Sequence, residues 1–213
     1  MMLFLDLDGT LIDSNGVWLA VDEAFVAKRG LELTEEYSYT VGHSIAPVAA
    51  RFTAEYYHLD EDPEDILTEW REMARNAYAH TIPLKPGALE LVKRAKAQGQ
   101  EMILLSSGIP ELSMLAVRRL GLDEYLKDYF FAHDVGLEKR DPRVYQLAAE
   151  RFGLSPADCV LIEDAPDNCA AASGVGFTVI GVYDDFYASR WEDVKRNSKR
   201  AIRNLKELFD HSC

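Results

Sequence analysis

The sequence predicts an α/β fold in which a parallel sheet carries helices on both faces and an all-helical segment is inserted after the first strand. Three observations lead to this prediction. A short apolar run near the start ends in charged and small residues, the chain from residue 83 onward alternates between helical and strand-like patterns, and residues 15–81 show helical patterns only. Repeated strand–helix units are typical of parallel sheets covered on both faces.

The predicted sheet begins with Leu3-Phe4-Leu5, which continues into Asp6-Leu7-Asp8-Gly9-Thr10. A continuous apolar run is typical of a strand buried on both faces, and such sheets bind ligands at the carboxyl ends of their strands. Asp6 and Asp8 stand at that end. Because a buried carboxylate needs a cation or hydrogen-bond donors, the pair indicates a metal site or a proton-transfer task. The alternative is an ordinary turn, in which Asp and Gly are common.

Residues 11–16 are expected to form a linker into the helical insertion, for which the patterns predict three helices. The first ends near Gly30, the second covers residues 45–57, and the third begins at Asp62-Pro63-Glu64, where a capping residue precedes a proline. The apolar face of the first helix is formed by Trp18, Val21, Phe25 and Val26. No strand is expected in this region.

From residue 83 the chain alternates between helix and strand, which predicts an α/β core of residues 1–14 and 82–213 around a helical domain of residues 15–81. Helices are expected to close at Gly99, Gly121, Gly153 and Gly174, and a last one follows Trp191. Strands are expected at residues 102–105, 129–132, 160–162 and 177–182, with an edge strand at 201–202.

Composition limits the function classes. The 213 residues carry a formal charge of −13, which disfavours a nucleic-acid polymer as partner because such proteins present a basic surface. No apolar run is long enough to span a bilayer and the start does not resemble a signal peptide, so we expect a cytoplasmic protein without a membrane partner, as a monomer or small homo-oligomer. Cys159, Cys169 and Cys213 have no C-x-x-C spacing, which argues against a disulfide framework and a structural zinc.

Side chains able to do chemistry follow four of the predicted strands. Taken singly, each has an ordinary explanation: Ser106 as a helix cap, Lys139 as a surface charge, and Glu163-Asp164 as a turn. Because parallel strands end at one edge of a sheet, their joint occurrence instead favours a single active site. The set is Asp6 and Asp8, Ser106 with Ser107 and Gly108, Lys139, and Glu163 with Asp164.

In this order the residues resemble the motifs of the haloacid dehalogenase superfamily of phosphotransferases. Asp6 to Thr10 is similar to the first motif, Ser106 to the second, Lys139 to the third and Glu163-Asp164 to the fourth. The resemblance covers nearly the whole chain and implies a Rossmann-like core with a helical cap domain. Two departures concern how Lys139 is held: Arg140-Asp141-Pro142 follows it where relatives commonly have Pro-x-Pro, and the preceding loop is short.

The resemblance implies an enzyme, a magnesium-dependent phosphatase that hydrolyses a small soluble phosphate monoester such as a sugar phosphate, phosphoglycolate or a nucleotide. Asp6 is expected to be the nucleophile that forms an aspartyl-phosphate, and Asp8 the general acid and base. Mg²⁺ would be held by Asp6, Asp164 and the backbone carbonyl of Asp8, with Glu163 in support. Lys139 and Ser106 would stabilise the phosphoryl charge. The candidates for substrate binding are Thr10, His43, Ser107 and Gly108.

Three other activities of the superfamily are carbon–halogen cleavage, phosphonate cleavage and phosphoryl transfer within a sugar, and the sequence disfavours the first two. Relatives that break carbon–halogen bonds lack the second aspartate, so Asp8 favours phosphoryl chemistry. Phosphonate-cleaving relatives need a cap lysine, and Lys28, the only lysine of the insertion, is expected to be solvated. A phosphomutase similar to β-phosphoglucomutase is the main alternative, and a non-catalytic binding module on the same fold is the third hypothesis.

Substrate choice is expected to lie in the helical insertion, whose loops would close over the leaving group. Gly42-His43-Ser44 stands where relatives with this kind of cap carry a specificity loop. Tyr39, Arg51 and Arg75 are further candidates, with a capping turn and surface cations as the alternative. Tyrosines at positions 37, 39, 56 and 57 form either the core of the cap or a wall of the pocket. Residues 184–187, after the last main strand, are expected to border the site.

Overall fold

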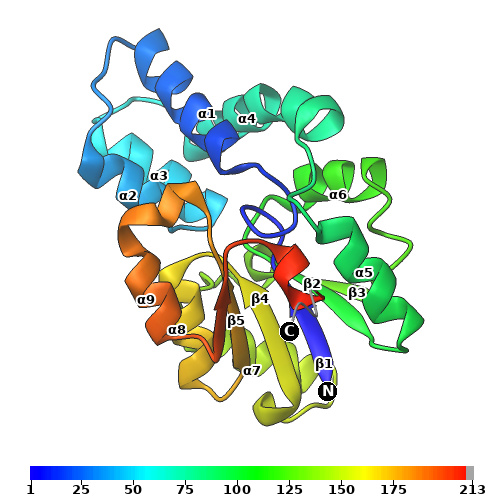
Figure 1. The fold of residues 1–213 in the computed structure, drawn as a ribbon. Helices are drawn as coiled ribbons and strands as arrows, with labels where there is room; N and C mark the ends of the chain where they lie inside the picture. Colours follow the sequence, from blue (N-terminus) through cyan, green and yellow to red (C-terminus); the bar gives the residue numbers. More distant parts are fainter. Residues whose placement is uncertain (210–213) are drawn as a thin grey trace.

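The computed structural model describes residues 1–209. They form a parallel sheet with flanking helices and a helical segment at one end of the strands (Figure 1). Within these residues six strands join in the order β3-β2-β1-β4-β5-β6, and every pairing is parallel. The strands are β1 (Met2–Leu5), β2 (Met102–Ser106), β3 (Asp128–Phe131), β4 (Cys159–Glu163), β5 (Thr178–Val182) and β6 (Arg200–Ile202). The predicted α/β class is confirmed.

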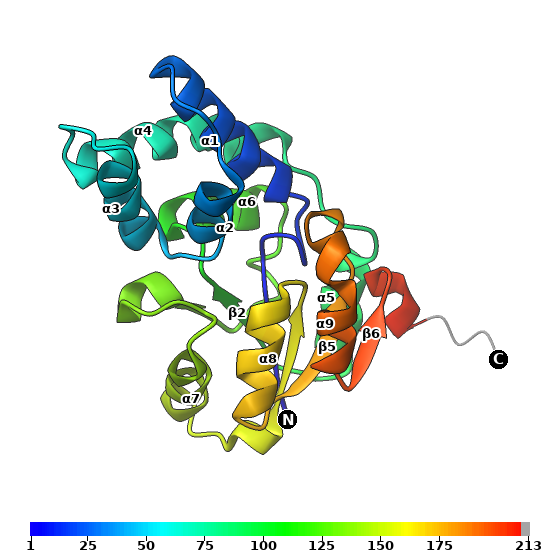
Figure 2. The same cartoon turned by 90° about the vertical axis from the view of Figure 1, so that its left-hand side faces the viewer.

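Alternate residues of the central strands face opposite layers, because side chains along a strand point to alternate faces. Leu3 and Leu5 of β1 belong to one buried cluster with α5 (Ala88–Ala97) and α6 (Pro110–Arg119). Phe4 belongs to a second cluster with three helices. They are α7 (Pro142–Arg151), α8 (Pro166–Gly174) and α9 (Trp191–Arg196), of which α7 and α8 lie side by side in Figure 2. Both faces of β1 are therefore covered, as its apolar sequence predicts.

The helical segment lies over the carboxyl ends of the strands (Figure 1). It contains α1 (Asn15–Lys28), α2 (Glu35–Gly42), α3 (Ala46–Tyr56) and α4 (Pro63–Asn76), followed by a π-helical turn, η1 (Ala77–Thr81). The three predicted helices are confirmed, and the Asp62 side chain caps α4 by accepting a hydrogen bond from the backbone N–H of Glu64 at 2.9 Å. Helix α2 was not predicted, although Thr34 caps it by accepting from the N–H of Tyr37 at 3.1 Å.

The chain passes into and out of the helical segment along two adjacent stretches. Ile12 forms a bridge with Leu84, the N–H of Asp13 donates to the carbonyl of Pro83 at 3.0 Å, and the N–H of Lys85 donates to the carbonyl of Leu11 at 2.9 Å. Residues 11–14 belong to no helix or strand and connect the core to the helical segment, so the predicted linker is wrong only for Asn15 and Gly16. Leu11 and Ile12 are fully buried because the second stretch covers them, and Asn15 and Gly16 already belong to α1.

The tyrosines of the helical segment divide between its core and its surface. Tyr37 is fully buried. Its ring stacks on that of Phe52 with 6.2 Å between the ring centroids, and the centroid of the Tyr57 ring lies 4.9 Å away. Tyr39 is 51% exposed. The cluster around Tyr37 is thus part of the core of the helical segment.

Two cysteines lie in the described residues. Cys159 of β4 and Cys169 of α8 are buried as free thiols in the second cluster, whereas Cys213 lies outside the described residues. Across residues 1–209, no helix combines the length and the apolar character that crossing a membrane requires.

Candidate active site

A cavity of about 170 Å³ separates the carboxyl ends of the strands from the helical segment. Its core wall contains Asp6 and Asp8 after β1, Ser107 and Gly108 after β2, Lys139, and Glu163 with Asp164 at the end of β4. The predicted site residues that come from separate strands are therefore brought to one place, as expected for a parallel sheet.

Lys139 joins the ends of β1 and β4. Its ammonium group donates to Asp6 Oδ1 at 2.6 Å and to Glu163 Oε2 at 2.5 Å, and all three side chains are buried. Burial disfavours the charged lysine, but the negative charges of Asp6 and Glu163 outweigh this and raise the pKa of Lys139. Asp141 caps the following helix α7 by accepting from the N–H of Arg143 at 2.9 Å. The departure from Pro-x-Pro thus coexists with a fully paired Lys139.

The acidic residues fit a metal ion. Each of Asp6, Glu163 and Asp164 places one carboxylate oxygen within 4.8 Å of the others. Asp6 Oδ2 is buried and has no hydrogen-bond partner among residues 1–209. Burial, and then the charge of Glu163, raise the pKa of Asp6 to about 7, although Lys139 opposes the shift. This uncompensated negative charge and the all-oxygen donor set are what a hard divalent cation requires.

Glu163 has a different position from the two aspartates, because both of its oxygens have partners. Oε1 accepts from the backbone N–H groups of Asp164 and Ala165 at 3.1 and 3.0 Å, and Oε2 accepts from Lys139. Glu163 therefore fixes the turn after β4 and orients Lys139, which agrees with the supporting position predicted for it.

Asp164 is held by the first loop. The Thr10 hydroxyl donates to Asp164 Oδ1 at 2.9 Å, and the Asn15 amide donates to Oδ2 at 3.2 Å. Thr10 was predicted to bind substrate, but it is fully buried and lies outside the cavity wall, because its hydroxyl faces Asp164. Gly9, in the same loop, has φ +85°, and a Cβ on it would lie only 2.2 Å from Asp164 Oδ2. The loop therefore requires glycine at this position.

Asp8 accepts hydrogen bonds from two groups that the motifs do not include. Its Oδ1 accepts from the Ser14 hydroxyl at 2.7 Å and from the Tyr78 hydroxyl. Burial raises the pKa of Asp8, and these two hydrogen bonds only partly oppose the shift. A raised pKa favours the protonated form of a carboxyl group, which is the form that a general acid needs.

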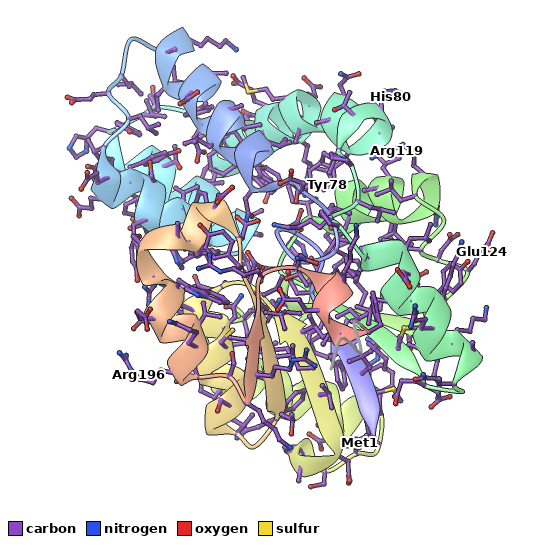
Figure 3. The ribbon with its side chains drawn as sticks, in the orientation of Figure 1. Met1, Tyr78, His80, Arg119, Glu124 and Arg196 are labelled. Carbon is purple, nitrogen blue, oxygen red and sulfur yellow. The ribbon has the colours of Figure 1, made fainter. Side chains whose placement is uncertain are left out.

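Tyr78 was not predicted as a site residue, because its sequence position continues the third predicted helix. Instead α4 ends at Asn76, and η1 turns the buried Tyr78 side chain toward the core, as Figure 3 shows. The indole N–H of Trp18 donates to the Tyr78 hydroxyl at 2.8 Å. A tyrosine in an apolar helical stripe carries no sequence signal for such a contact.

The turn after β2 brings Ser107 and Gly108, but not Ser106, to the cavity. Ser106 is fully buried, and its hydroxyl accepts from the N–H of Gly108 at 2.9 Å. In this structure Ser106 therefore shapes the turn, whereas its predicted contact was with a phosphoryl oxygen. A Cβ on Gly108 would lie 2.9 Å from Asp8 Oδ2, so the close approach of the turn to Asp8 depends on glycine.

The helical segment supplies the opposite wall. The predicted loop Gly42-His43-Ser44 lines the cavity, as do Phe186 and Tyr187 from the segment expected to border the site. His43 Nε2 lies 3.6 Å from Asp167 Oδ2. The wall also contains Asp22 and Trp70, which were not predicted. Four other candidates lie elsewhere: Tyr39, Arg51 and Arg75, which are exposed, and Lys28, which pairs with Glu69 at 3.0 Å.

Comparison with known proteins gives consistent results. A family model for haloacid dehalogenase-like hydrolases matches residues 1–176. (S)-2-haloacid dehalogenase 4A from Burkholderia cepacia is 26% identical across 96% of this chain and 91% of that protein. The GMP/IMP nucleotidase YrfG from Escherichia coli strain K12 is 29% identical across 82% of this chain and 78% of that protein. A further relative is 38% identical, over a match that covers only 32% of that relative's length.

A solved structure agrees with the fold. CbbY from Rhodobacter sphaeroides, in complex with phosphate, superposes with a TM-score of 0.78 at 22% identity, across 98% of this chain and 96% of that one. At this identity the likeness concerns the fold alone. Because the family model spans most of its length, the chain belongs to the haloacid dehalogenase-like hydrolases, as its motifs predict.

Proposed function

We propose that the enzyme is a Mg²⁺-dependent phosphatase that hydrolyses a small soluble phosphate monoester. The observation that carries this proposal is the meeting of Asp6, Asp8 and Lys139 on one wall of the cavity, with Asp6 Oδ2 free of hydrogen bonds within the described residues. A phosphate monoester needs a positioned nucleophile, a proton donor for its leaving oxygen and compensation of its negative charge. These three residues provide each requirement.

Asp6 acts as the nucleophile. One of its carboxylate oxygens bonds to phosphorus while the bond from phosphorus to the leaving oxygen breaks, which produces an aspartyl-phosphate. Asp8 gives its proton to the leaving oxygen and later accepts a proton from the water that attacks the aspartyl-phosphate, so that Asp6 and inorganic phosphate are released. Asp8 also favours phosphoryl transfer over carbon–halogen cleavage, in which no leaving oxygen needs a proton.

The charge of the reacting group is compensated by the protein and by a cation. Lys139 retains its positive charge beside Asp6 and lowers the repulsion between that carboxylate and the phosphoryl oxygens. Asp6, Asp164 and the backbone carbonyl of Asp8 would hold Mg²⁺, and Glu163 would support this arrangement through Lys139 and the turn after β4. When bound, the cation supplies further neutralisation of the phosphoryl group.

The helical segment, residues 15–81, acts as a cap over the core of residues 1–14 and 82–213. Its wall, including His43, contacts the leaving group, whereas Ser107 and Gly108 lie on the phosphate side. The substrate is therefore a small phosphorylated metabolite that this cavity encloses. The relative named a nucleotidase acts on a substrate of this kind. A cytoplasmic location and a monomeric or small homo-oligomeric state stay predictions.

The test is phosphate release from a panel of phosphorylated metabolites, with Mg²⁺ or with a chelator, by the wild type and by Asp6→Asn. Release that requires Mg²⁺ and disappears in Asp6→Asn is the expected result. Transfer of phosphate between positions of a sugar with little net release would favour the phosphomutase. Turnover by Asp6→Asn at the wild-type rate would contradict the assignment of the nucleophile.

A further inference from the structure

Asp22 is a buried acidic residue in the cap wall of the cavity. It lies on α1, is 8% exposed, and lines the same cavity as Asp6 and Asp8. Burial and the negative charge of Glu23 are the influences on its carboxyl group, with no hydrogen-bond donor and no cationic side chain among them within residues 1–209. Burying a carboxylate without a partner costs free energy. Asp22 is therefore expected to meet a group that enters the cavity.

The surroundings of Asp22 do not compensate its charge. Glu23, the next residue on α1, adds negative charge, and the nearby Tyr37 and Tyr57 are neutral side chains whose pKa values are raised, mainly by burial. The indole N–H of Trp70 is also buried without a partner among the described residues, and it lines the same cavity. The cap wall thus offers both an acceptor and a donor that the protein leaves unused.

The cavity offers little to a second anionic group. Of the described residues in its wall, only Lys139 and His43 have basic side chains. Lys139 already pairs with Asp6 and Glu163. His43 Nε2 lies 3.6 Å from Asp167 Oδ2, beyond hydrogen-bond distance, and is buried without a hydrogen-bond partner among the described residues. A carboxylate or second phosphate on the leaving group would lie in the same cavity as Asp22, and like charges repel strongly where water is excluded. The His43 imidazole is the one basic group of this wall that is not already paired, among the described residues.

We infer that the enzyme selects phosphate monoesters whose leaving group carries an ammonium group, which Asp22 binds. This inference rests on the proposed phosphatase function and names its substrate class as phosphorylated amino alcohols or amino sugars. An ammonium donates charge-assisted hydrogen bonds to the carboxylate and neutralises it, which a hydroxyl does not. Trp18 and Trp70 add aromatic surface that favours a cation, and the Trp70 N–H is available to an oxygen of the same leaving group.

Two series of esters that differ only in charge test this inference. The first contains aminoethyl phosphate, hydroxyethyl phosphate and phosphoglycolate, and the second contains glucosamine 6-phosphate, glucose 6-phosphate and 6-phosphogluconate. In at least one series, kcat/KM of the wild type is expected to be about tenfold or more higher for the ammonium ester than for the hydroxyl ester, and lowest for the carboxylate.

Asp22→Asn removes the charge and nearly preserves the shape, so it is expected to lower the ratio of kcat/KM for ammonium over hydroxyl ester by about tenfold or more. Glu23→Gln is the matched control, because it makes the same charge change on the adjacent exposed position outside the cavity wall. In this control the ratio is expected to stay at the wild-type value. Asp22→Ser provides a second variant should Asp22→Asn fail to fold.

Equal kcat/KM across both series, a preference for the carboxylates, or an equal loss for all esters in the Asp22 variants would overturn the inference while leaving the phosphatase in place. Absence of phosphate release from every ester would instead overturn the proposed function. Calorimetric binding to Asp6→Asn then decides the inference separately. Tighter binding of the ammonium ester by about tenfold supports it, and equal or undetectable binding overturns it.

Discussion

The hydroxyl of Tyr78 donates a hydrogen bond to the carboxylate of Asp8, which lies 70 residues earlier in the chain. The turn that carries Tyr78 is tied to the core, because the guanidinium of Arg119 on α6 donates to the backbone carbonyl of Tyr78 at 3.1 Å and to that of Ile82 (Figure 3). Trp18 donates to the same tyrosine from the first cap helix. The proposed acid is therefore oriented by residues of the inserted segment.

Tyr78→Phe is expected to lower kcat/KM for alkyl phosphates by about tenfold. This ratio reports the first transfer, in which Asp8 protonates the leaving oxygen, and general acid catalysis contributes about 10²–10⁴-fold and depends on the position of the acid. With p-nitrophenyl phosphate the loss should be small, because nitrophenolate leaves without a proton. Steady-state kinetics on both esters measures the difference. Tyr37→Phe is the control, because it removes another buried cap hydroxyl, one that contacts Thr53 at 3.2 Å. An equal loss on both esters would assign Tyr78 a purely structural role.

Lys139→Met is expected to destabilise the fold as well as to abolish activity. It leaves Asp6 and Glu163 buried beside each other without their common cation. Removing one partner of a buried ion pair costs about 3–5 kcal/mol, which urea unfolding of the metal-free protein would measure. Lys127→Met removes a lysine from an exposed pair with Glu101 and should cost less than about 1 kcal/mol. Similar losses in the two variants would contradict the buried pairing.

Adding Mg²⁺ is expected to raise the melting temperature, because a ligand that binds only the folded state stabilises it, by about 2.7 kcal/mol at a concentration 100 times Kd. Asp164→Asn should lose most of this increase, since it removes a ligand charge from the cluster of three carboxylates. Asp134→Asn changes an aspartate whose side chain is 61% exposed and should retain the increase. A full increase in Asp164→Asn would exclude Asp164 from the site.

Asp22 should make the protein less stable as the pH rises. Burial, and then Glu23, raise the pKa of Asp22 from 3.8 to about 7 in the folded state, so between these values the folded protein binds more protons than the unfolded chain. The contribution of Asp22 to the free energy of unfolding is therefore fully present below about pH 4 and is lost as the pH rises through about 7. Asp22→Asn should gain stability over the wild type at pH 8 but not at pH 4, by on the order of 2–4 kcal/mol.

Urea unfolding of both proteins at the two pH values measures this difference. Glu23→Gln, at the exposed neighbouring position, should show only a minor change between them. A wild type and an Asp22→Asn variant whose stabilities differ equally at both pH values would show that Asp22 titrates at its ordinary pKa in the folded protein.

The sheet and its catalytic edge follow from patterns that the sequence contains. Apolar runs that end in polar residues predict β1, β2 and β4, and the parallel pairing of β1 with β4 brings Asp6 and Asp164 together. Lys139 lies in the loop after the edge strand β3, so its contacts with Asp6 and Glu163 depend also on the path of that loop.

Other parts of the site depend on directions that periodicity does not specify. The hydroxyl of Ser106 contacts the backbone of Gly108, and that of Thr10 contacts Asp164. Both directions depend on local backbone geometry. Tyr78 depends on where α4 gives way to η1. Asp22, however, did carry a signal. It lies four residues after Trp18 and three before Phe25, so a charge occupies an otherwise apolar helical face.

The paired stretches through Ile12 and Leu84 also have an evolutionary consequence. Since the backbones of Asp13 and Pro83 are already hydrogen-bonded, a continuous insert between them can be exchanged for another without reopening the sheet. Such an exchange would replace the cavity wall of the helical segment as a unit, while the proposed nucleophile Asp6, Lys139 and the proposed metal ligands stay in the core. The new segment must nevertheless bring its own donor for Asp8, because Tyr78 leaves with the segment it replaces.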